Sequence, residues 1–227
     1  MIAVQEAKSI IQKRISLLGT ETVSLHDAGN RVLGQDIVAT FPLPRFNNSA
    51  MDGFSLRAAD TNGASQSNPV TLKMVSVSSA GTPSEIIVDS GECTQCMTGA
   101  KIPDGADTIV MVEDTSGFSD ADSVQIFLEA HPGKHIRKQG EEIQEGDVLI
   151  HRGTRITPGE IGILATFGYK KIPVAKKPRI AIFGTGDELI EPGNDLLPGQ
   201  IYNSNLYVFE DLVRRAGAEA ALKNVIK

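Results

Sequence analysis

The chain has 227 residues, 41% of them hydrophobic and 5% aromatic, with 22 basic and 28 acidic residues and a formal net charge of −6. This length accommodates one large domain or two to three small ones, and the acidic balance argues against a general binder of nucleic acids or membrane surfaces. Few aromatic residues and no tryptophan also argue against stacking platforms for single-stranded nucleic acid.

The N-terminal segment has apolar residues at helical spacing. They recur every three or four positions, at Val4, Ala7, Ile11, Ile15 and Leu18. This spacing predicts an amphipathic helix that ends at Gly19. A short turn or helix and then a strand over about residues 32–39 are expected next.

The loop PRFNNSAMDGF spans residues 44–54. Its proline, its asparagines and its Asp-Gly pair are typical of turns. Turn chemistry does not explain Arg45 or Asp52. The loop is therefore either an ordinary surface loop or one that holds the Asp52 carboxylate in a fixed position.

The sequence after this loop changes to β-branched runs broken by glycine, proline and serine. Short strands with turn signals at this interval predict a small β-barrel or sandwich-like subdomain over residues 54–130.

The segment ITPGEIGILATFGYKK predicts a helix with marked ends. Thr157 is expected as the N-cap, Pro158 as the first helical residue and Glu160 as the partner that closes a capping box. Gly168 is expected just beyond the helix, where a left-handed residue is favoured.

The sequence of the last fifty residues predicts the first strands and helix of a parallel α/β sheet. A strand over residues 180–183 is followed by a glycine turn, then by a helix with Leu206, Phe209 and Leu212–Val213 facing inward, and then by another strand. Parallel sheets are normally buried on both faces. Either further residues of a longer chain or a partner chain is therefore expected to cover this piece.

The glycine turn FGTGDEL carries the strongest local signal for chemistry. Gly184, Thr185 and Gly186 follow a strand at the edge where open α/β folds bind ligands, and glycines let a phosphate approach the backbone. Asp187 and Glu188 would supply oxygen ligands to Mg²⁺. The motif is neither a dinucleotide fingerprint nor a Walker loop, so a plain turn with solvated acids has equal weight.

Two further segments offer weaker signals. Thr98 in MTGAKIPDGAD either contacts a phosphate or organises a turn, and by itself the turn is favoured. In HPGKHIRKQGEEI, Arg137 and Lys138 belong to a positive cluster suited to a small anion, although charge runs are usually solvated surface. Glu142 would position Arg137 or contribute to a metal site.

The cysteines of CTQC, Cys93 and Cys96, are expected to be ordinary thiols, because there is no second such pair and no zinc-finger histidine spacing. No Ser-His-Asp order or HExxH motif supports hydrolysis. With two cysteines, no signal-peptide pattern and no run of about 18 apolar residues, the cytoplasm is the expected location.

These segments together resemble one family. In order and spacing, PLPRFNNSAMDGF, MTGAKIPDGAD, IRKQGEEI, GTRITPGEIGILATFG and RIAIFGTGDEL are similar to the molybdopterin molybdotransferases, the MoeA and gephyrin E-domain-like enzymes of molybdenum cofactor synthesis. The resemblance covers essentially the whole chain, which corresponds to the N-terminal half of such an enzyme and is expected to lack activity by itself.

The resemblance implies a multidomain α+β and α/β fold. An elongated helical and linker region would comprise residues 1–53 and 131–175, with a β-rich subdomain of residues 54–130 inserted in it. Residues 176–227 would begin a parallel α/β molybdopterin-binding domain.

The resemblance also implies an activity and a site. The family inserts molybdate into adenylated molybdopterin and releases AMP with the help of Mg²⁺. The implied catalytic residues are Asp52, Thr98, Arg137 and Glu188. The implied cofactor-binding residues are Gly184, Thr185, Gly186, Asn205 and Lys138. The implied metal ligands are Asp187, Glu188 and Glu142, the last standing where the family often has aspartate.

A homodimer is the implied assembly, with molybdopterin adenylyltransferase as a further partner and with no nucleic acid or membrane. Two alternatives stay open, a non-catalytic molybdopterin-binding or scaffold protein and the adenylyltransferase itself. The long region before Ile180 argues against the latter, which is essentially the α/β domain alone.

Overall fold

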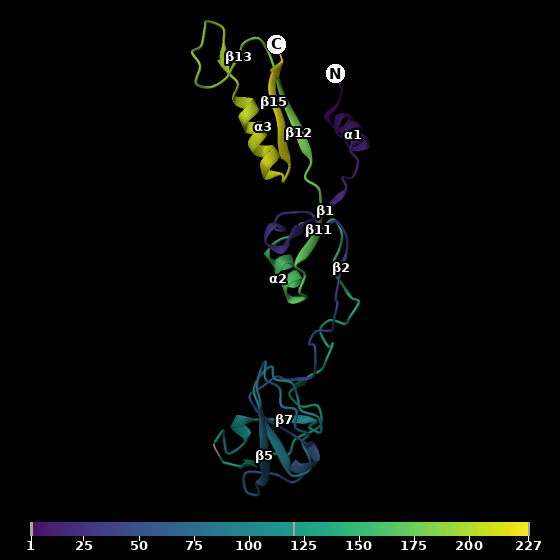
Figure 1. The fold of residues 1–227 in the computed structure, drawn as a ribbon, viewed down its shortest axis with the longest axis vertical. Coiled ribbons are helices and arrows are strands. Elements are labelled where there is room, and N and C mark those ends of the chain that lie inside the picture. Colours follow the sequence, from purple (N-terminus) through teal and green to yellow (C-terminus); the bar gives the residue numbers. More distant parts are fainter. Residues whose placement is uncertain (1, 120, 227) are drawn as a thin grey trace. The chain divides into compact units, whose positions relative to one another are not determined.

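The computed structural model describes residues 2–119 and 121–226. The chain divides into two compact units, one of residues 38–147 and one that combines the residues up to 37 with those from 148 on. Both units contain helical segments as well as strands, so the mixed α and β class predicted from the sequence is confirmed at that level (Figure 1).

The unit of residues 38–147 is built on one five-stranded sheet in the order β7-β4-β6-β5-β8. All neighbours in it are antiparallel except β5 and β6, which are parallel. Its elements are β3 (Asn48–Ser49), β4 (Gly53–Leu56), η2 (Ala58–Thr61), β5 (Val70–Ser78), β6 (Glu92–Cys96), β7 (Thr108–Met111), η3 (Val112–Asp114), β8 (Ser123–Ile126) and β9 (Ile136–Arg137).

This sheet curls so that the segment after β7 meets β8 at the opposite edge. The Ser116 N–H donates to the Gln125 carbonyl at 2.9 Å, and the Phe127 N–H donates to the Asp114 carbonyl at 3.0 Å. The expected β-rich subdomain is therefore a single curled sheet, and not a two-layer sandwich.

The core of this unit lies against β4, whose four residues are all buried. One cluster comprises Phe54, Leu56, Leu72, Cys93, Val110, Val124, Ile126 and Ala130. A second comprises Cys96, Ala100, Ile102 and Ile109. Full burial of a leucine or phenylalanine side chain stabilises the fold by about 1.5–3 kcal/mol, so β4 anchors the unit.

The other unit begins with a helix and a pair of strands. Its elements up to residue 175 are α1 (Val4–Arg14), β1 (Thr20–Ser24), η1 (Leu25–Asp27), β2 (Ile37–Val38, where the chain passes to the other unit), β10 (Val148–Ile150), α2 (Pro158–Thr166) and β11 (Lys171–Ala175). Strands β1 and β11 pair antiparallel. Their core consists of Ala28, Leu33, Ile37, Ile150, Ile156, Leu164, Ile172 and Val174.

Helix α2 has the ends that the sequence predicts. The Glu160 carboxylate accepts hydrogen bonds from the backbone N–H of Thr157, at 2.8 Å, and from its hydroxyl. These bonds lower the pKa of Glu160. Gly168 has a φ of +72°, as expected for the residue beyond the cap.

Helix α1 is shorter than predicted. It ends at Arg14, and Ile15 is already extended. The following residues lead into β1, where the Lys176 N–H bonds the Gly19 carbonyl at 2.9 Å, and this extended pairing cannot coexist with a helix that continues to Gly19. No residue of α1 is buried.

The end of the chain forms a parallel β-α-β arrangement, as predicted. Strands β12 (Arg179–Thr185) and β15 (Glu219–Ile226) pair in parallel, and α3 (Ser204–Arg215) connects them. The short strands β13 (Leu189–Ile190) and β14 (Ile201–Tyr202) pair with each other beside it.

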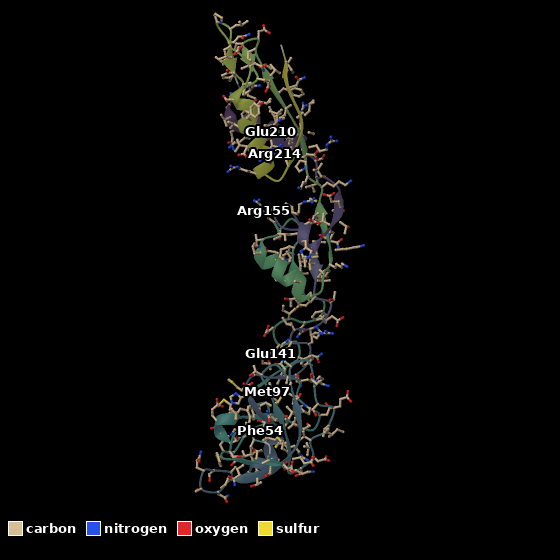
Figure 2. The ribbon with its side chains drawn as sticks, turned by 60° about the vertical axis from the view of Figure 1, so that its left-hand side comes forward. Phe54, Met97, Glu141, Arg155, Glu210 and Arg214 are labelled. Carbon is tan, nitrogen blue, oxygen red and sulfur yellow. The ribbon has the colours of Figure 1, made fainter. Side chains whose placement is uncertain are left out.

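The predicted inward face of α3 is wrong in part. Leu206 is buried, but Phe209 and Leu212 are 54% and 53% exposed. The face against the strands runs instead through Leu206 and Glu210, four residues apart. Glu210 is paired with Arg214 at 2.5 Å and Lys223 at 2.6 Å (Figure 2), which makes burial of this carboxylate tolerable.

The cap of α2 yields a testable prediction. Thr157→Ala removes the hydroxyl that bonds Glu160, and it should lower the free energy of unfolding by about 1 kcal/mol in chemical denaturation. Thr166→Ala in the last turn of the same helix is the matched control and should leave stability unchanged or higher, since alanine favours the helix interior. Equal losses in both variants would contradict a capping role for Thr157.

Candidate functional site

The loop that enters β4 is shaped by one close backbone contact. A Cβ on Gly53 would lie 2.0 Å from the Val110 carbonyl oxygen, so only glycine fits there. Gly53 is a strand residue that pairs with Cys96 and Met111. The Asp-Gly pair is therefore the entry to a central strand, and not the tight turn suggested by its composition.

Asp52 holds Thr98 at the tip of a neighbouring loop. Asp52 Oδ1 accepts hydrogen bonds from the Thr98 N–H and from the Thr98 hydroxyl, both at 2.7 Å. These two bonds, the backbone one first, lower the pKa of Asp52 below its ordinary value of 3.8. The predicted catalytic pair is thus in direct contact, with an ionised and exposed carboxylate.

Backbone hydrogen bonds join three loops around this pair. The Gly99 N–H donates to the Ser49 carbonyl at 2.8 Å, and the Ser49 N–H donates to the Ala100 carbonyl at 3.0 Å. Strand β3 pairs with β9, which places Asn48 opposite Arg137. The loops that carry Asp52, Thr98 and Arg137 therefore form one connected structure.

The structure explains Arg45, which turn chemistry left open. Its guanidinium lies 4.8 Å from the centre of the Phe41 ring, a cation–π contact, and its carbonyl accepts a hydrogen bond from Gln139 at 2.9 Å. Arg45 therefore fastens the loop at residues 44–54 to the segment after β9.

The remaining predicted residues of this unit lie just beyond β9. Lys138 is exposed, and its backbone N–H donates to the Glu141 carboxylate at 2.8 Å. Glu142 is also exposed, and its N–H donates to the Leu43 carbonyl at 3.0 Å. These contacts leave the side chains of Lys138 and Glu142 directed to solvent and free to meet a ligand.

A second candidate site is a cleft of about 370 Å³ in the other unit. It lies at the carboxyl end of β12 and the N-terminus of α3, where oriented N–H groups favour anions. Its lining residues are Ile182, Phe183, Gly184, Thr185, Glu188, Leu189, Ile201, Tyr202, Asn203, Ser204, Asn205, Leu206 and Phe209. The cleft therefore contains Gly184, Thr185, Glu188 and Asn205 of the predicted set.

Gly186 and the two acids complete this turn. Gly186 has a φ of +144°, and the Glu188 carboxylate covers its α-carbon so closely that a Cβ would lie 2.5 Å from a carboxylate oxygen. Asp187 and Glu188 are exposed, and within the described part of the chain their carboxylates have no hydrogen-bond or ion-pair partner. Both acids are thus available to a cation.

No group of three or more His, Cys, Asp and Glu residues arranged to hold a metal occurs among residues 2–119 and 121–226. Mg²⁺ commonly uses one or two carboxylates and completes its shell with substrate phosphates and water. The acids of the glycine turn fit such a shared site, but not a site made of protein ligands alone.

Sequence reasoning missed two buried asparagines. Asn203, which is 2% exposed, lines the cleft beside Gly184, and its side-chain nitrogen has no partner in the described chain. Asn48, 7% exposed, likewise has an unpartnered side-chain oxygen. An unsatisfied buried amide is costly unless a ligand or water meets it. Both residues were hidden in the sequence because asparagine is common in turns.

The two cysteines are free and buried, as predicted. Burial raises the pKa of Cys93 to about 12 and that of Cys96 to about 11. Both thiols are therefore protonated at neutral pH and unreactive as nucleophiles or metal ligands.

Comparison with known proteins gives a consistent picture. A family model described as the MoeA N-terminal region (domain I and II) matches residues 2–168. Molybdopterin molybdenumtransferase 2 of Mycobacterium tuberculosis is 42% identical over 96% of this chain and 53% of its own length. The molybdopterin molybdenumtransferase of Bacillus subtilis is 42% identical over 88% of this chain and 47% of its own.

A solved structure supports the same relationship. A molybdopterin biosynthesis MoeA protein from Pyrococcus horikoshii superposes with a TM-score of 0.88 at 32% identity, covering 100% of this chain and 60% of that one. The chain spans about half the length of the curated relatives it matches. None of the helices in the described residues has the length and apolar character needed to cross a membrane.

The Asp52–Thr98 contact predicts a pH-dependent stability. Because the folded-state pKa of Asp52 is lowered, its stabilisation is present above the unfolded-state pKa and is lost as pH falls through the folded-state value. The difference in melting temperature between wild type and Asp52→Asn should therefore be largest at neutral pH, should shrink as pH falls below about 3.8, and should vanish only once pH is below the lowered folded-state pKa.

Asp104→Asn is the matched control, since Asp104 is an exposed acid of the same unit without a side-chain partner in the described chain. Its effect should be near zero at every pH. A difference for Asp52→Asn that stays constant with pH would contradict the role of the charged hydrogen bonds.

Proposed function

The chain belongs to the family of MoeA N-terminal regions, and on this basis we propose that it forms the N-terminal half of a molybdopterin molybdenumtransferase. In the complete enzyme this half would help to insert molybdate into adenylated molybdopterin, with release of AMP. The family membership supports a role in molybdenum cofactor synthesis. The two candidate sites support separate roles for the two units, one in binding phosphates and the other in binding the oxyanion.

The observation that carries the proposal is the cleft at the carboxyl end of β12. It combines Gly184 and Thr185 of the glycine turn, the N-terminus of α3 and the amide nitrogen of Asn203, which has no partner among the described residues. The N-terminus of α3 and the Asn203 amide offer N–H donors, which is what the phosphates of an adenylated pterin require. Asn205, in the first turn of α3, would contact the nucleotide from the same side.

Mg²⁺ would be held by Asp187 and Glu188 together with substrate phosphates. Glu142, in the unit of residues 38–147, is a candidate metal ligand of that unit. When bound, Mg²⁺ supplies positive charge that stabilises the phosphates during cleavage. The residues of the turn would hold the phosphates against the backbone amides. Cleavage of the pyrophosphate bond then needs no protein nucleophile.

The unit of residues 38–147 would handle the oxyanion. Molybdate is a tetrahedral dianion, and the planar fork of Arg137 together with Lys138 suits such a group. The Thr98 hydroxyl donates its proton to Asp52, so towards a ligand its oxygen acts as an acceptor. Asp52 would therefore act mainly by fixing the position of Thr98.

The proposal includes the arrangement of domains and partners. Residues 1–53 with 131–175 would be the linker region, residues 54–130 the inserted subdomain and residues 176–227 the start of the molybdopterin-binding domain. A homodimer is supported by the apolar residues of α1 that lie open to solvent, such as Val4 at 73% and Ile11 at 58% exposed. The partner that supplies adenylated molybdopterin would be the adenylyltransferase.

Binding of adenylated molybdopterin to the chain tests the cleft. Calorimetric titration with and without Mg²⁺ should give tighter binding with Mg²⁺, and Glu188→Ala should remove most of that gain by removing a ligand. The control is Asp195→Ala, an exposed acid of the neighbouring loop that does not line the cleft. If Mg²⁺ tightened binding to Glu188→Ala as much as to wild type, Glu188 would not be a metal ligand.

Catalysis is tested by joining this chain to the remaining half of the Mycobacterium tuberculosis relative and following AMP release with molybdate present. Glu188→Ala and Arg137→Gln should each slow release at least tenfold, because charge at the reacting phosphates or oxyanion would be unbalanced. Binding without molybdate-dependent AMP release in the joined protein would favour the scaffold alternative.

A further inference from the structure

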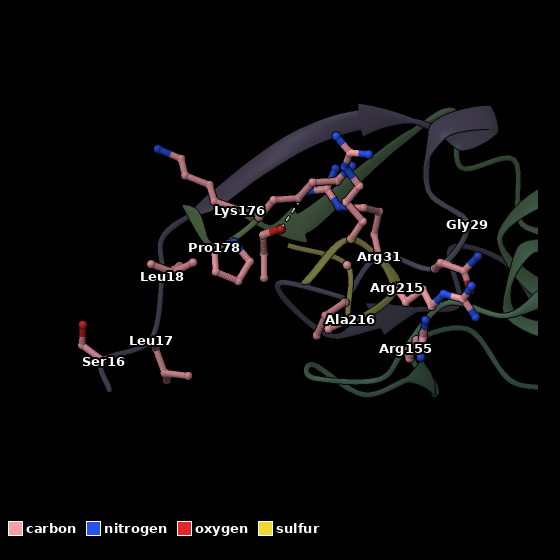
Figure 3. Close-up of a pocket in the computed structure, with 16 residues that line it drawn as sticks. Ser16, Leu17, Leu18, Gly29, Arg31, Arg155, Lys176, Pro178, Arg215 and Ala216 are labelled. Carbon is pink, nitrogen blue, oxygen red and sulfur yellow. Dashed lines mark hydrogen bonds between the residues drawn. The ribbon is translucent and has the colours of Figure 1, made fainter. Parts of the chain in front are cut away.

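A larger pocket, of about 570 Å³, lies in the same unit as the cleft but at the other end of the β-α-β arrangement. It is formed where the chain enters β12 and where α3 ends (Figure 3). Its basic lining residues are Arg31, Arg155, Lys176, Lys177, Arg214 and Arg215. None of the predicted site residues lines it.

The floor of this pocket is fixed by hydrogen bonds between separate segments. The Arg31 guanidinium donates to the Ala175 carbonyl at 2.7 Å and is ion-paired with Glu21. The Ile156 N–H donates to the Arg31 carbonyl at 2.8 Å, and Val32 forms a β-bridge with Arg155. Arg155 and Arg31 are therefore held on adjoining backbone segments without any ligand.

The pocket has an excess of positive charge. Its described lining contains six basic side chains and no acidic one. Three of the six are neutralised by acids outside the pocket: Arg31 by Glu21, Arg214 by Glu210 and Arg215 by Asp211.

The other three, Arg155, Lys176 and Lys177, have no side-chain partner in the described chain, which leaves a local charge of 6 − 3 = +3. The C-terminal end of α3 contributes only about −0.5 of an elementary charge. The cations therefore dominate, in a chain whose net charge is −6. Clustering like charges costs free energy unless an anion offsets their repulsion.

One wall of the pocket is apolar. Leu17 and Leu18 are 87% and 46% exposed, and Val32 and Pro178 continue the same lining. A bare oxyanion would fill little of this volume and would leave the leucines in water. A ligand that carries both several phosphates and a flat apolar part would use the cations and the wall together.

We propose that this pocket binds a nucleoside polyphosphate, of the class of nucleoside triphosphates, with its base against the apolar wall. The phosphates contact Arg155, Lys176 and Lys177, and Arg31 supports them from the floor. This binding is separate from substrate binding at the glycine turn and does not depend on the function proposed above.

Calorimetric titration of the chain with ATP, tripolyphosphate, inorganic phosphate and adenosine tests the proposal. ATP or tripolyphosphate should bind, with an affinity that falls as salt is raised from low to physiological concentration. Adenosine should not bind. ATP should bind more tightly than tripolyphosphate, because only ATP places a base against the apolar wall, and the reverse order would overturn the assignment of a nucleotide.

The double variant Arg155→Gln/Lys177→Gln should weaken this binding about tenfold while the melting temperature stays unchanged, because both side chains are exposed and unpaired. Lys8→Gln/Lys13→Gln removes the same charge from α1, outside the pocket, and should bind like wild type. With Mg²⁺ present, Glu188→Ala should also bind ATP like wild type, which separates this pocket from the cleft, where Glu188 would hold the metal shared with the phosphates.

Equal affinities in the pocket variant and the α1 variant would overturn the proposal, as would the absence of any binding of ATP and tripolyphosphate. Loss of ATP binding in Glu188→Ala with Mg²⁺ present, with retention in the pocket variant, would place the nucleotide in the cleft instead, and would likewise overturn the proposal.

Discussion

The close approach of β4 to β7 at Gly53 is the constraint on which the unit of residues 38–147 depends. No side chain fits between Gly53 and the Val110 carbonyl, so β4 can pair between β7 and β6 only with glycine at its first position. Asp52 stands immediately before this contact. Its carboxylate is thereby brought to the Thr98 loop, where two hydrogen bonds keep it ionised. The packing of the sheet and the geometry of the candidate site thus have one origin.

The other unit separates two electrostatic environments along one β-α-β arrangement. The carboxyl end of β12 is followed by Asp187 and Glu188, whose carboxylates have no partner among the described residues, a combination with the helix N-terminus suited to a metal ion shared with phosphates. The opposite end presents Arg155, Lys176 and Lys177, likewise without side-chain partners in the described part of the chain, beside leucines, a combination suited to phosphates without a metal. The acidic net charge of the chain conceals both, since net charge says nothing of how charges are distributed.

Much apolar surface remains exposed in the described chain. Helix α1 buries none of its residues, and Phe209 and Leu212 of α3 and Phe183 of β12 are about half exposed. A two-stranded parallel piece cannot cover both its faces, which explains why the sequence pattern of α3 indicates more burial than this chain provides.

The sequence by itself determined the elements whose signals are local. The capping box of α2 and the turn with Gly186 follow from residues within a few positions of one another, so they were predictable. The parallel β-α-β order was predictable because a strand, a helix and a strand follow one another along the chain. The tertiary structure alone decided that α1 ends at Arg14, that Asp52 binds Thr98 and that the side-chain nitrogen of Asn203 is buried without a partner among the described residues. Each of these depends on segments distant in sequence, whose pairing no local pattern encodes. The basic pocket has the same origin, because its cations come from four separate segments that only folding brings together.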